Sequence, residues 1–339
     1  MTVRDVAARA GVALSTVSNA VNHPERLAAS TLERVNAAIA ELGFIRNDAA
    51  RQLRLGSSNV FGMVVIDATS PYYAELDRSV ENEAERHGYA VLLGNSGQDP
   101  ARQSKRIVLF EAQRMRGLLV APVSRDLDQL AEVVGRGLPV TLIDYVDPQG
   151  RFPSVAVDHV RGGELAAAHL TQSGCTRIGL VQGPVDFPQI VERMTGAESA
   201  IQAAGATSID LRATALTFEG GLLLGRELCA MDAASRPDGV FAATDQVAMG
   251  VVHAIVTDAH LRVPEDIAVV GYDDIEYAEG ALVPLTTVRQ PIATLGHEAV
   301  QLLLRQIEGD TRPTVKIFEP ELVVRASAPA QRPTATGRA

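Results

Sequence analysis

The sequence predicts two architectures in one chain: a short all-α head, and an α/β body of two lobes that are each a doubly wound parallel sheet. The head is indicated by apolar residues at helical spacing, with Gly11 and Gly43 where helices would end. The body is indicated by a change at Val60 to short apolar runs that alternate with helical stretches, which is typical of parallel sheets covered on both faces. This alternation stops after "VTLID" and restarts after "SVAVD", so we expect two lobes rather than one.

Charge is distributed unevenly along the 339 residues. The net charge is −10, yet residues 1–56 hold seven Arg against five acidic residues, so a mildly basic head is joined to an acidic body. This asymmetry is compatible with DNA contact but does not establish it. The N-terminus "MTVRDVAARAG" lacks the charged-then-apolar order of a signal peptide, and runs such as "GLLVAPV" are too short to span a bilayer. We therefore expect a cytoplasmic protein that does not contact membranes.

Three short helices are expected in the head. The first has Thr2 as its cap, the second runs from about Leu14 to Val21, and the third ends at Gly43. The apolar residues expected to face inward are Val3, Val6, Ala7, Ala10, Val12, Val17, Val21, Leu32, Val35, Ile39 and Leu42. Three helices with a glycine at the first turn describe a helix-turn-helix domain, whose second helix enters the major groove of DNA. The alternative at this point is a small three-helix interaction module with a solvated polar face.

The head resembles that of a known family. "TVRDVAARAGVALSTVSNAVN" and "ERVNAAIAELGFIRNDAARQLR" are similar to the head of the lactose-repressor (LacI/GalR) family of bacterial transcription regulators. The specific matches are V-x-D-V-A-x-x-A-G-V, the T-V-S run and N-x-x-A-R-x-L. The resemblance implies that Leu14, Ser15 and Asn19 read bases. The positions that it implies for phosphate contacts are Thr2, Thr16, Ser18, Asn22 and Thr31.

The segment "NDAARQLRLG" at 47–56 is similar to the hinge helix of that family, which pairs with its counterpart over the minor groove. At this length a helix is too short to be stable alone in water. The resemblance implies a wedge between central base pairs at Leu53. The DNA-binding positions that it implies in this segment are Asn47, Ala50, Arg51 and Leu53.

Two positions of the head depart from the family pattern. Arg46 replaces the usual proline of the linker, which adds a charge near the expected DNA backbone. Ala28 stands where the family usually has the serine that caps the third helix. Ser30 and Glu33 could form a capping box two residues later, so the start of this helix is open.

Polar side chains follow the predicted strands of the body. Asp144 ends "VTLID" and Asp273 ends "VVGYD", one in each lobe, and ligands of such sheets bind beyond the carboxyl ends of the strands. A carboxylate only accepts hydrogen bonds and so suits a hydroxyl-rich ligand, whereas Arg193 supplies donors. We expect these charged groups to be solvated in the free protein. The alternative for each aspartate is a strand-end carboxylate that caps a helix or a loop.

The resemblance extends through the body to about residue 328. The body is similar to the periplasmic-binding-protein type I fold. The effector-binding positions that it implies are Tyr72, Tyr73, Asp144, Arg193, Thr244, Asp273 and Gln290. Thr244 stands where the family most often has Asn, so one amide contact is missing and the identity of the ligand is open.

The expected domain boundaries follow from these assignments. We expect a helix-turn-helix domain at 1–46, a hinge helix and linker at 47–58, and an effector-binding and dimerisation core at 59–328. Within the core, lobe 1 should comprise about 59–157 and 290–318, and lobe 2 about 158–289 and 319–328. The Pro/Ala/Thr-rich tail at 329–339 is expected to be disordered.

Motifs of enzymes and of cofactor sites are missing from the sequence. No G-x-G-x-x-G follows a strand and no G-x-x-x-x-G-K-[ST] occurs, so the phosphate loops of nucleotide cofactors are absent. Cys175 and Cys229 form no C-x-x-C and are expected to be buried thiols. We expect no cofactor, no metal and no catalytic residue. An enzyme on a doubly wound scaffold would need a nucleophile–base arrangement, and an exported sugar-binding protein would need a secretion signal.

These observations together predict a homodimeric transcriptional regulator, a repressor rather than an enzyme. Its partners would be double-stranded operator DNA and a small polar effector, such as a sugar, a sugar derivative or a nucleoside, bound between the two lobes. The effector would change DNA affinity through its differential affinity for two arrangements of the lobes.

Overall fold

The computed structural model describes residues 1–44, 58–185 and 187–331. The chain divides into two compact units, Met1–Ser58 and Asn59–Ala339. Each unit has buried hydrophobic clusters of its own. The predicted fold class is confirmed: a helical head precedes a core of two mostly parallel sheets.

The head contains the helices α1 (Val3–Ala10), α2 (Leu14–Asn22) and α3 (Ala29–Leu42), with a 3₁₀ turn over Pro24–Arg26. The backbone N–H and the hydroxyl of Thr2 donate to the Asp5 carboxylate at 2.7 and 3.1 Å, which starts α1 as expected. Gly11 and Gly43 end α1 and α3 with φ angles of 64° and 57°, a left-handed conformation that a side chain would disfavour. Local sequence therefore determines where these helices begin and end.

The head differs from expectation at two points. Val3 was expected inside but is 40% exposed, because it lies outside the cluster formed around Val6, Val17 and Val35. The capping box of Ser30 with Glu33 is not formed. The backbone is already helical from Ala29, so Ser30 lies inside the first turn and cannot cap it, and no side chain caps this helix.

One lobe of the core is a six-stranded parallel sheet in the order β11-β5-β4-β3-β1-β2. Its strands are β1 (Val60–Val65), β2 (Ala90–Asn95), β3 (Gly117–Val120), β4 (Val140–Ile143), β5 (Ser154–Val157) and β11 (Val315–Phe318). Its helices are α5 (Pro71–Arg86), α6 (Pro100–Ala112), α7 (Asp128–Gly135) and α12 (Ile292–Ile307). The central strands β3 and β4 are buried at every residue, as expected for strands covered on both faces.

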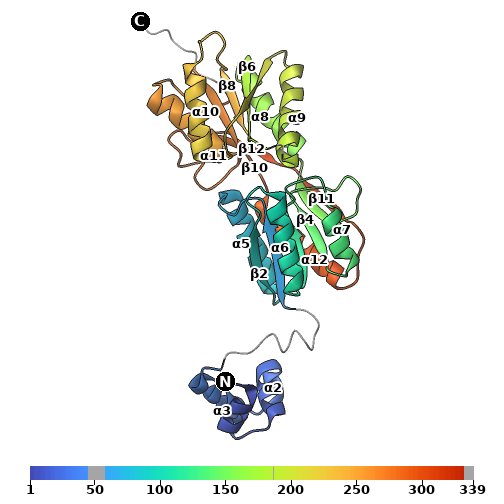
Figure 1. Ribbon diagram of the computed structural model, residues 1–339. Coiled ribbons are helices and arrows are strands. Elements are labelled where there is room, and N and C mark those ends of the chain that lie inside the picture. The colour runs from blue at the N-terminus through green and yellow to red at the C-terminus, as the bar shows by residue number, and fades with distance from the viewer. Residues whose placement is uncertain (45–57, 186, 332–339) are drawn as a thin grey trace. The chain divides into compact units, whose positions relative to one another are not determined.

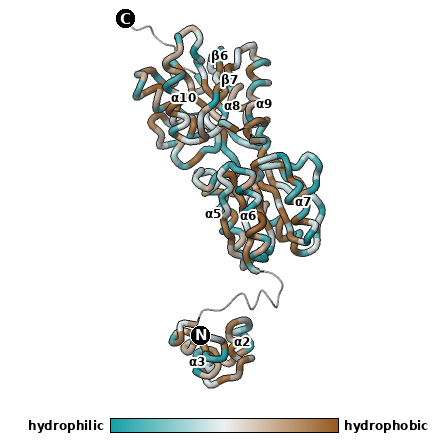
Figure 2. Tube along the Cα trace, viewed as in Figure 1, coloured by the Kyte–Doolittle hydropathy of each residue, from teal (hydrophilic) through white to brown (hydrophobic). Residues whose placement is uncertain are grey.

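The other lobe is a six-stranded sheet in the order β12-β10-β9-β8-β6-β7, parallel except for the antiparallel pair β10–β12. Its strands are β6 (Arg177–Gln182), β7 (Thr207–Arg212), β8 (Gly239–Ala242), β9 (Ala268–Asp273), β10 (Thr286–Arg289) and β12 (Glu321–Val323). Its helices are α8 (His159–Gln172), α9 (Pro188–Ala203), α10 (Phe218–Ala230) and α11 (Asp245–His253), the last continued by a π-helical turn over Ala254–Asp258. Both lobes mix hydrophobic and hydrophilic segments along their helices (Figure 2).

Within the described core the chain crosses between the lobes after β5, after β10 and after β11. Figure 1 shows one consequence: α12, coloured orange-red, lies in the lobe of the blue and green helices α5 to α7. In both sheets the strand order reverses beside the first strand, β1 in one and β6 in the other. Ligands of doubly wound sheets bind outside the carboxyl ends of the strands at such a reversal.

Candidate functional site

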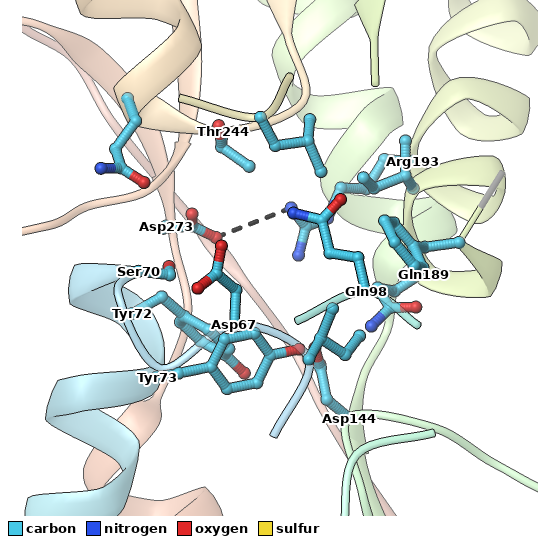
Figure 3. A pocket seen from close by; sticks show the side chains of 15 residues that line it. Asp67, Ser70, Tyr72, Tyr73, Gln98, Asp144, Gln189, Arg193, Thr244 and Asp273 are labelled. Carbon is cyan, nitrogen blue, oxygen red and sulfur yellow. Dashed lines mark ion pairs between the residues drawn. The ribbon is translucent and has the colours of Figure 1, made fainter. Parts of the chain in front are cut away.

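A pocket in the core is lined by residues of both lobes (Figure 3). The lining residues from the lobe of β1 are Ile66, Asp67, Ser70, Tyr72, Tyr73, Gln98 and Asp144, and those from the lobe of β6 are Phe187, Gln189, Ile190, Arg193, Leu216, Thr244, Gln246 and Asp273. The cavity has a volume of about 60 Å³, which is room for roughly four to six water molecules. An enclosed ligand is therefore a small metabolite rather than a polymer.

Most of the predicted effector positions lie in this pocket. The lining positions among them are Tyr72, Tyr73, Asp144, Arg193, Thr244 and Asp273. Gln290 is not in the lining; it lies behind Asp273 and donates from Nε2 to Asp273 Oδ1 at 2.8 Å. The two lobes thus bring together side chains that are far apart in the sequence.

Asp144 follows β4 and is only 2% exposed. Its φ of 58° is left-handed, which is uncommon for a residue with a side chain and stores strain at the end of the strand. One carboxylate oxygen, Oδ1, is 2.8 Å from Nε2 of His159, the first residue of α8. The lobe of β1 therefore offers the pocket a carboxylate that already has a protein partner.

Arg193 and Asp273 form the centre of the other wall. Arg193 Nη1 lies 3.6 Å from Asp273 Oδ1, the ion pair drawn in Figure 3, and donates to the carbonyl of Ala243 at 2.7 Å. Its guanidinium carbon is 3.7 Å from the centre of the Tyr272 ring, a cation–π contact. Burial raises the pKa of Asp273 to about 7, against the opposing effects of Arg193 and of the bond from Gln290.

The three charged groups of the pocket have partners within the protein. Asp144, Arg193 and Asp273 are each buried, with at most 5% exposed. Their hydrogen bonds within the protein go to His159, Gln290 and backbone, because a buried charge needs a compensating partner. The pocket is thus pre-organised by the protein itself.

Two neutral polar groups in the pocket have no hydrogen-bond partner in the described part of the chain. They are the hydroxyl of Tyr72 and Oε1 of Gln189. The rings of Tyr72 and Tyr73 meet edge to face with centroids 5.0 Å apart. Burial raises the pKa of both phenols well above the usual value, so they stay protonated near neutral pH. An unpaired buried acceptor is costly, and a ligand that donates to it would remove that cost.

Sequence reasoning missed several residues of this site. Asp67, Ser70, Gln98 and Gln189 line the pocket from loops and helix starts, and no motif marks them. His159 stands behind Asp144, and no motif marks it either. The one available signal was its place directly after the predicted strand "SVAVD", where the chain passes from one lobe to the other.

The outer face of α2 carries the predicted base-reading positions. Leu14 is 47% exposed, Ser15 is exposed and Asn19 is half-buried, whereas Val17 and Ala20 on the opposite face are buried in the head. Among the predicted phosphate contacts, Thr2 is exposed and Thr16, Ser18 and Thr31 are half-buried. Asn22 is the last residue of α2. The predicted positions Asn47, Ala50, Arg51 and Leu53 lie outside the described residues.

Of the described residues, no group of three or more His, Cys, Asp or Glu side chains is arranged to hold a metal ion. Cys175 is buried and Cys229 is half-buried, and the two thiols are not joined in a disulfide. No helix in the described ranges is long and apolar enough to cross a membrane.

Comparison with known proteins identifies the family of this chain. Residues 2–47 match the description "Bacterial regulatory proteins, lacI family", and residues 167–328 match the periplasmic binding protein-like domain. The chain is 34% identical over 335 residues to the ribose operon repressor of Escherichia coli K12, which covers 96% of this chain and 99% of the relative. The chain belongs to the lacI family of bacterial regulatory proteins.

Two solved structures are similar to this chain. A Lac repressor dimer bound to operator and the anti-inducer ONPF matches with a TM-score of 0.84 and 28% identity, over 97% of this chain and 99% of that one. A LacI family regulator from Enterococcus faecium with bound ribose matches with a TM-score of 0.69 and 28% identity, over 80% and 99%. This lacI-family chain is a sequence-specific DNA-binding regulator of transcription whose operator affinity is controlled by a small polar metabolite.

Proposed function

We propose that the chain is a homodimeric repressor in which each head binds one half of a near-palindromic operator. Two similarities support this assembly: a relative is named a repressor, and a similar solved structure is a dimer on operator DNA. The protein would act by binding rather than by catalysis, in the cytoplasm where the DNA lies. The outer face of α2, with Leu14, Ser15 and Asn19, would read base edges in the major groove.

We propose that the effector is an uncharged polyhydroxylated molecule of monosaccharide size. Three carboxylates line the pocket, Asp67, Asp144 and Asp273, against the single guanidinium of Arg193. A phosphate group would meet like charge there, whereas hydroxyl groups would donate to the carboxylates. The unpaired Oε1 of Gln189 also calls for a ligand that donates, and the unpaired hydroxyl of Tyr72 can donate to or accept from a ligand hydroxyl. D-ribose is the first probe, because a relative is named the ribose operon repressor and a similar structure holds ribose.

The convergence of Asp144, Arg193 and Asp273 from two lobes on one small cavity is the observation that carries this proposal. The proposed class of effector is tested by isothermal titration of the full chain with D-ribose, D-glucose, D-xylulose and ribose 5-phosphate. Operator-binding curves are measured with each compound as well. At least one unphosphorylated sugar should bind and change operator affinity, and ribose 5-phosphate should bind at least tenfold more weakly. Asp273→Ala should remove the influence of the sugar while operator affinity without it stays within a few-fold. Preferential binding of the phosphate, or full sugar affinity in Asp273→Ala, would refute the assignment of this pocket.

An exposed apolar patch on the lobe of β6 fits the proposed dimer. Phe218 is 39% and Leu282 is 58% exposed, and both line a hollow with Met249 and Val252. Large apolar side chains gathered on a surface mark interaction sites. Leu282→Glu should shift the protein from dimer to monomer in sedimentation velocity and weaken operator binding, since one head alone reads half a site. An unchanged dimer would place the interface elsewhere.

A further inference from the structure

His159 links the two lobes behind the pocket. It is the first residue of α8, directly after β5, and is 2% exposed. Nε2 lies 2.8 Å from Oδ1 of Asp144, and Nδ1 lies 3.1 Å from the Tyr272 hydroxyl and 3.3 Å from Arg193 Nε. Asp144 follows β4 of one sheet, whereas Tyr272 and Arg193 belong to β9 and α9 of the other lobe. One imidazole therefore joins a pocket carboxylate of one lobe to two side chains of the other.

The hydrogen bonds assign the tautomer of this histidine. The Nε–H of an arginine can only donate, so Nδ1 of His159 accepts from Arg193 and carries no proton. The proton of the neutral ring is then on Nε2, where it is donated to Asp144. A neutral ring also suits its neighbour, because a second positive charge beside the Arg193 guanidinium would be repelled. The contact between His159 and Asp144 is thus a single directed N–H···O bond.

The partners of His159 on the second lobe are held rigidly with it. A Cβ at Gly162, one turn along α8, would collide with the Tyr272 hydroxyl, and a Cβ at Gly163 would collide with the carbonyl of Arg193. α8 therefore packs against β9 and α9 at a distance that only glycine permits. His159, Tyr272 and Arg193 form one body, and Asp144 is the member of the group on the other lobe. Relative movement of the lobes must then strain or break the bond from His159 to Asp144.

We propose that His159 is the residue that couples effector binding at Asp144 to the arrangement of the second lobe. Oδ1 of Asp144 is taken by His159, which leaves the other oxygen for a ligand hydroxyl. When Asp144 shifts on ligand binding, its bond from His159 moves the imidazole. Because His159 also contacts Arg193 and Tyr272, the shift reaches the second lobe. The bond differs between lobe arrangements, which is the differential interaction that an allosteric effect requires. His159 is itself absent from the pocket lining, so it acts as a positioning residue. This inference rests on the proposed function of the pocket.

The chain offers a matched control on the same helix. His169 is also buried in α8, and its Nε2 bonds the carbonyl of Ala328 at 2.7 Å, away from the pocket. His159→Phe and His169→Phe each remove one buried histidine of α8 with its hydrogen bonds. His159→Gln keeps one donor and one acceptor and serves as the conservative variant. Both Phe variants should lose stability, but only His159→Phe should lose the coupling between effector binding and operator affinity.

The first test compares operator affinity of the full chain with and without saturating D-ribose. The ratio of the two affinities should fall at least tenfold toward one in His159→Phe, stay within threefold of wild type in His159→Gln, and be unchanged in His169→Phe. An unchanged ratio in His159→Phe, with ribose still bound, would overturn the proposal.

A second test needs no effector and so remains decisive if D-ribose does not bind the wild type. The full chain labelled with ¹⁵N-histidine should show two buried rings in the Nε2–H tautomer with protons protected from exchange: His159, and His169, whose Nε2 can only donate to the carbonyl of Ala328. One of these signals should vanish in His159→Gln and the other in His169→Phe, which assigns each signal to its residue. If the ring that is lost in His159→Gln proves to be protonated on Nδ1, or on both nitrogens near pH 7, the coupling through Asp144 is overturned. Failure of ribose alone would refute only the choice of effector.

Discussion

The head and the pocket present their functional side chains in opposite ways. On α2 the predicted contact residues are exposed or half-buried, and the buried Val17 and Ala20 lie on the other face of the helix. In the pocket Asp144, Arg193 and Asp273 are buried and bound to protein partners. Substitution on α2 should therefore change recognition without changing folding, whereas substitution in the pocket should change both. This contrast can be measured residue by residue.

The largest expected effect is that of Arg193→Ala. Removal of this guanidinium leaves the Asp273 carboxylate buried without its cationic partner. Truncation of one partner of a buried ion pair lowers the free energy of unfolding by about 3–5 kcal/mol. The free energy of unfolding should fall by this order, and sugar binding should become undetectable. Arg136→Ala is the surface control: Arg136 pairs with Glu111 but its side chain is 51% exposed, so solvent screens the pair and its loss should destabilise the protein far less than Arg193→Ala does. Equal losses in urea titrations of the two variants would contradict the pre-organised pocket.

The next effect is a dependence of stability on pH that Asp273 confers. Its pKa is raised from 3.8 to about 7 by burial, so the folded protein binds this proton more tightly than the unfolded chain. Stability from this residue is present below pH 4 and is lost as the pH rises toward 7. Since one pKa unit corresponds to about 1.4 kcal/mol, the loss is at most roughly 4 kcal/mol. Between pH 4 and 7 the free energy of unfolding of wild type should therefore fall relative to that of Asp273→Asn. Parallel curves for the two proteins would show that Asp273 is ionised throughout.

On the head, Asn19→Ala should act on recognition alone. A bidentate contact of an asparagine with adenine is worth about 1–3 kcal/mol at one half-site position. Because Asn19 is half-buried on the outer face, the free energy of unfolding should change by less than about 0.5 kcal/mol. Binding-site selection with the variant should return a sequence relaxed at one position. An unchanged preferred sequence would make Asn19 a phosphate or structural residue.

The same contrast explains what sequence reasoning could predict. Helix ends in the head depend on local residues such as Gly11 and Gly43, which can be identified one at a time. Asp144 and Asp273 could be placed near one another because parallel strands end at a common edge. The partners of these carboxylates could not be predicted, because His159 and Gln290 lie where the chain crosses between lobes. Their contacts depend on how two sheets close on each other, which no local pattern encodes.

Thr244 should give the smallest effect and tests whether a pocket residue can act mainly as a helix cap. Its hydroxyl accepts from the backbone N–H of Val247 at the start of α11, at 3.4 Å, while the residue also lines the pocket. This distance is long for a hydrogen bond, so Thr244→Ala should cost about 0.5–1 kcal/mol of stability, the lower part of the range for caps.

Thr244→Asn separates the two roles of this residue. Asparagine caps helices as well as threonine does, so stability should stay within about 0.5 kcal/mol of wild type. Its amide adds a donor and an acceptor to the pocket wall, so the affinity for D-ribose should change several-fold. Thermal melts and isothermal titration of both variants decide between the roles. If Thr244→Asn loses stability as Thr244→Ala does, the cap needs the shape of threonine. If ribose affinity is the same in all three proteins, position 244 lies outside the ligand contacts.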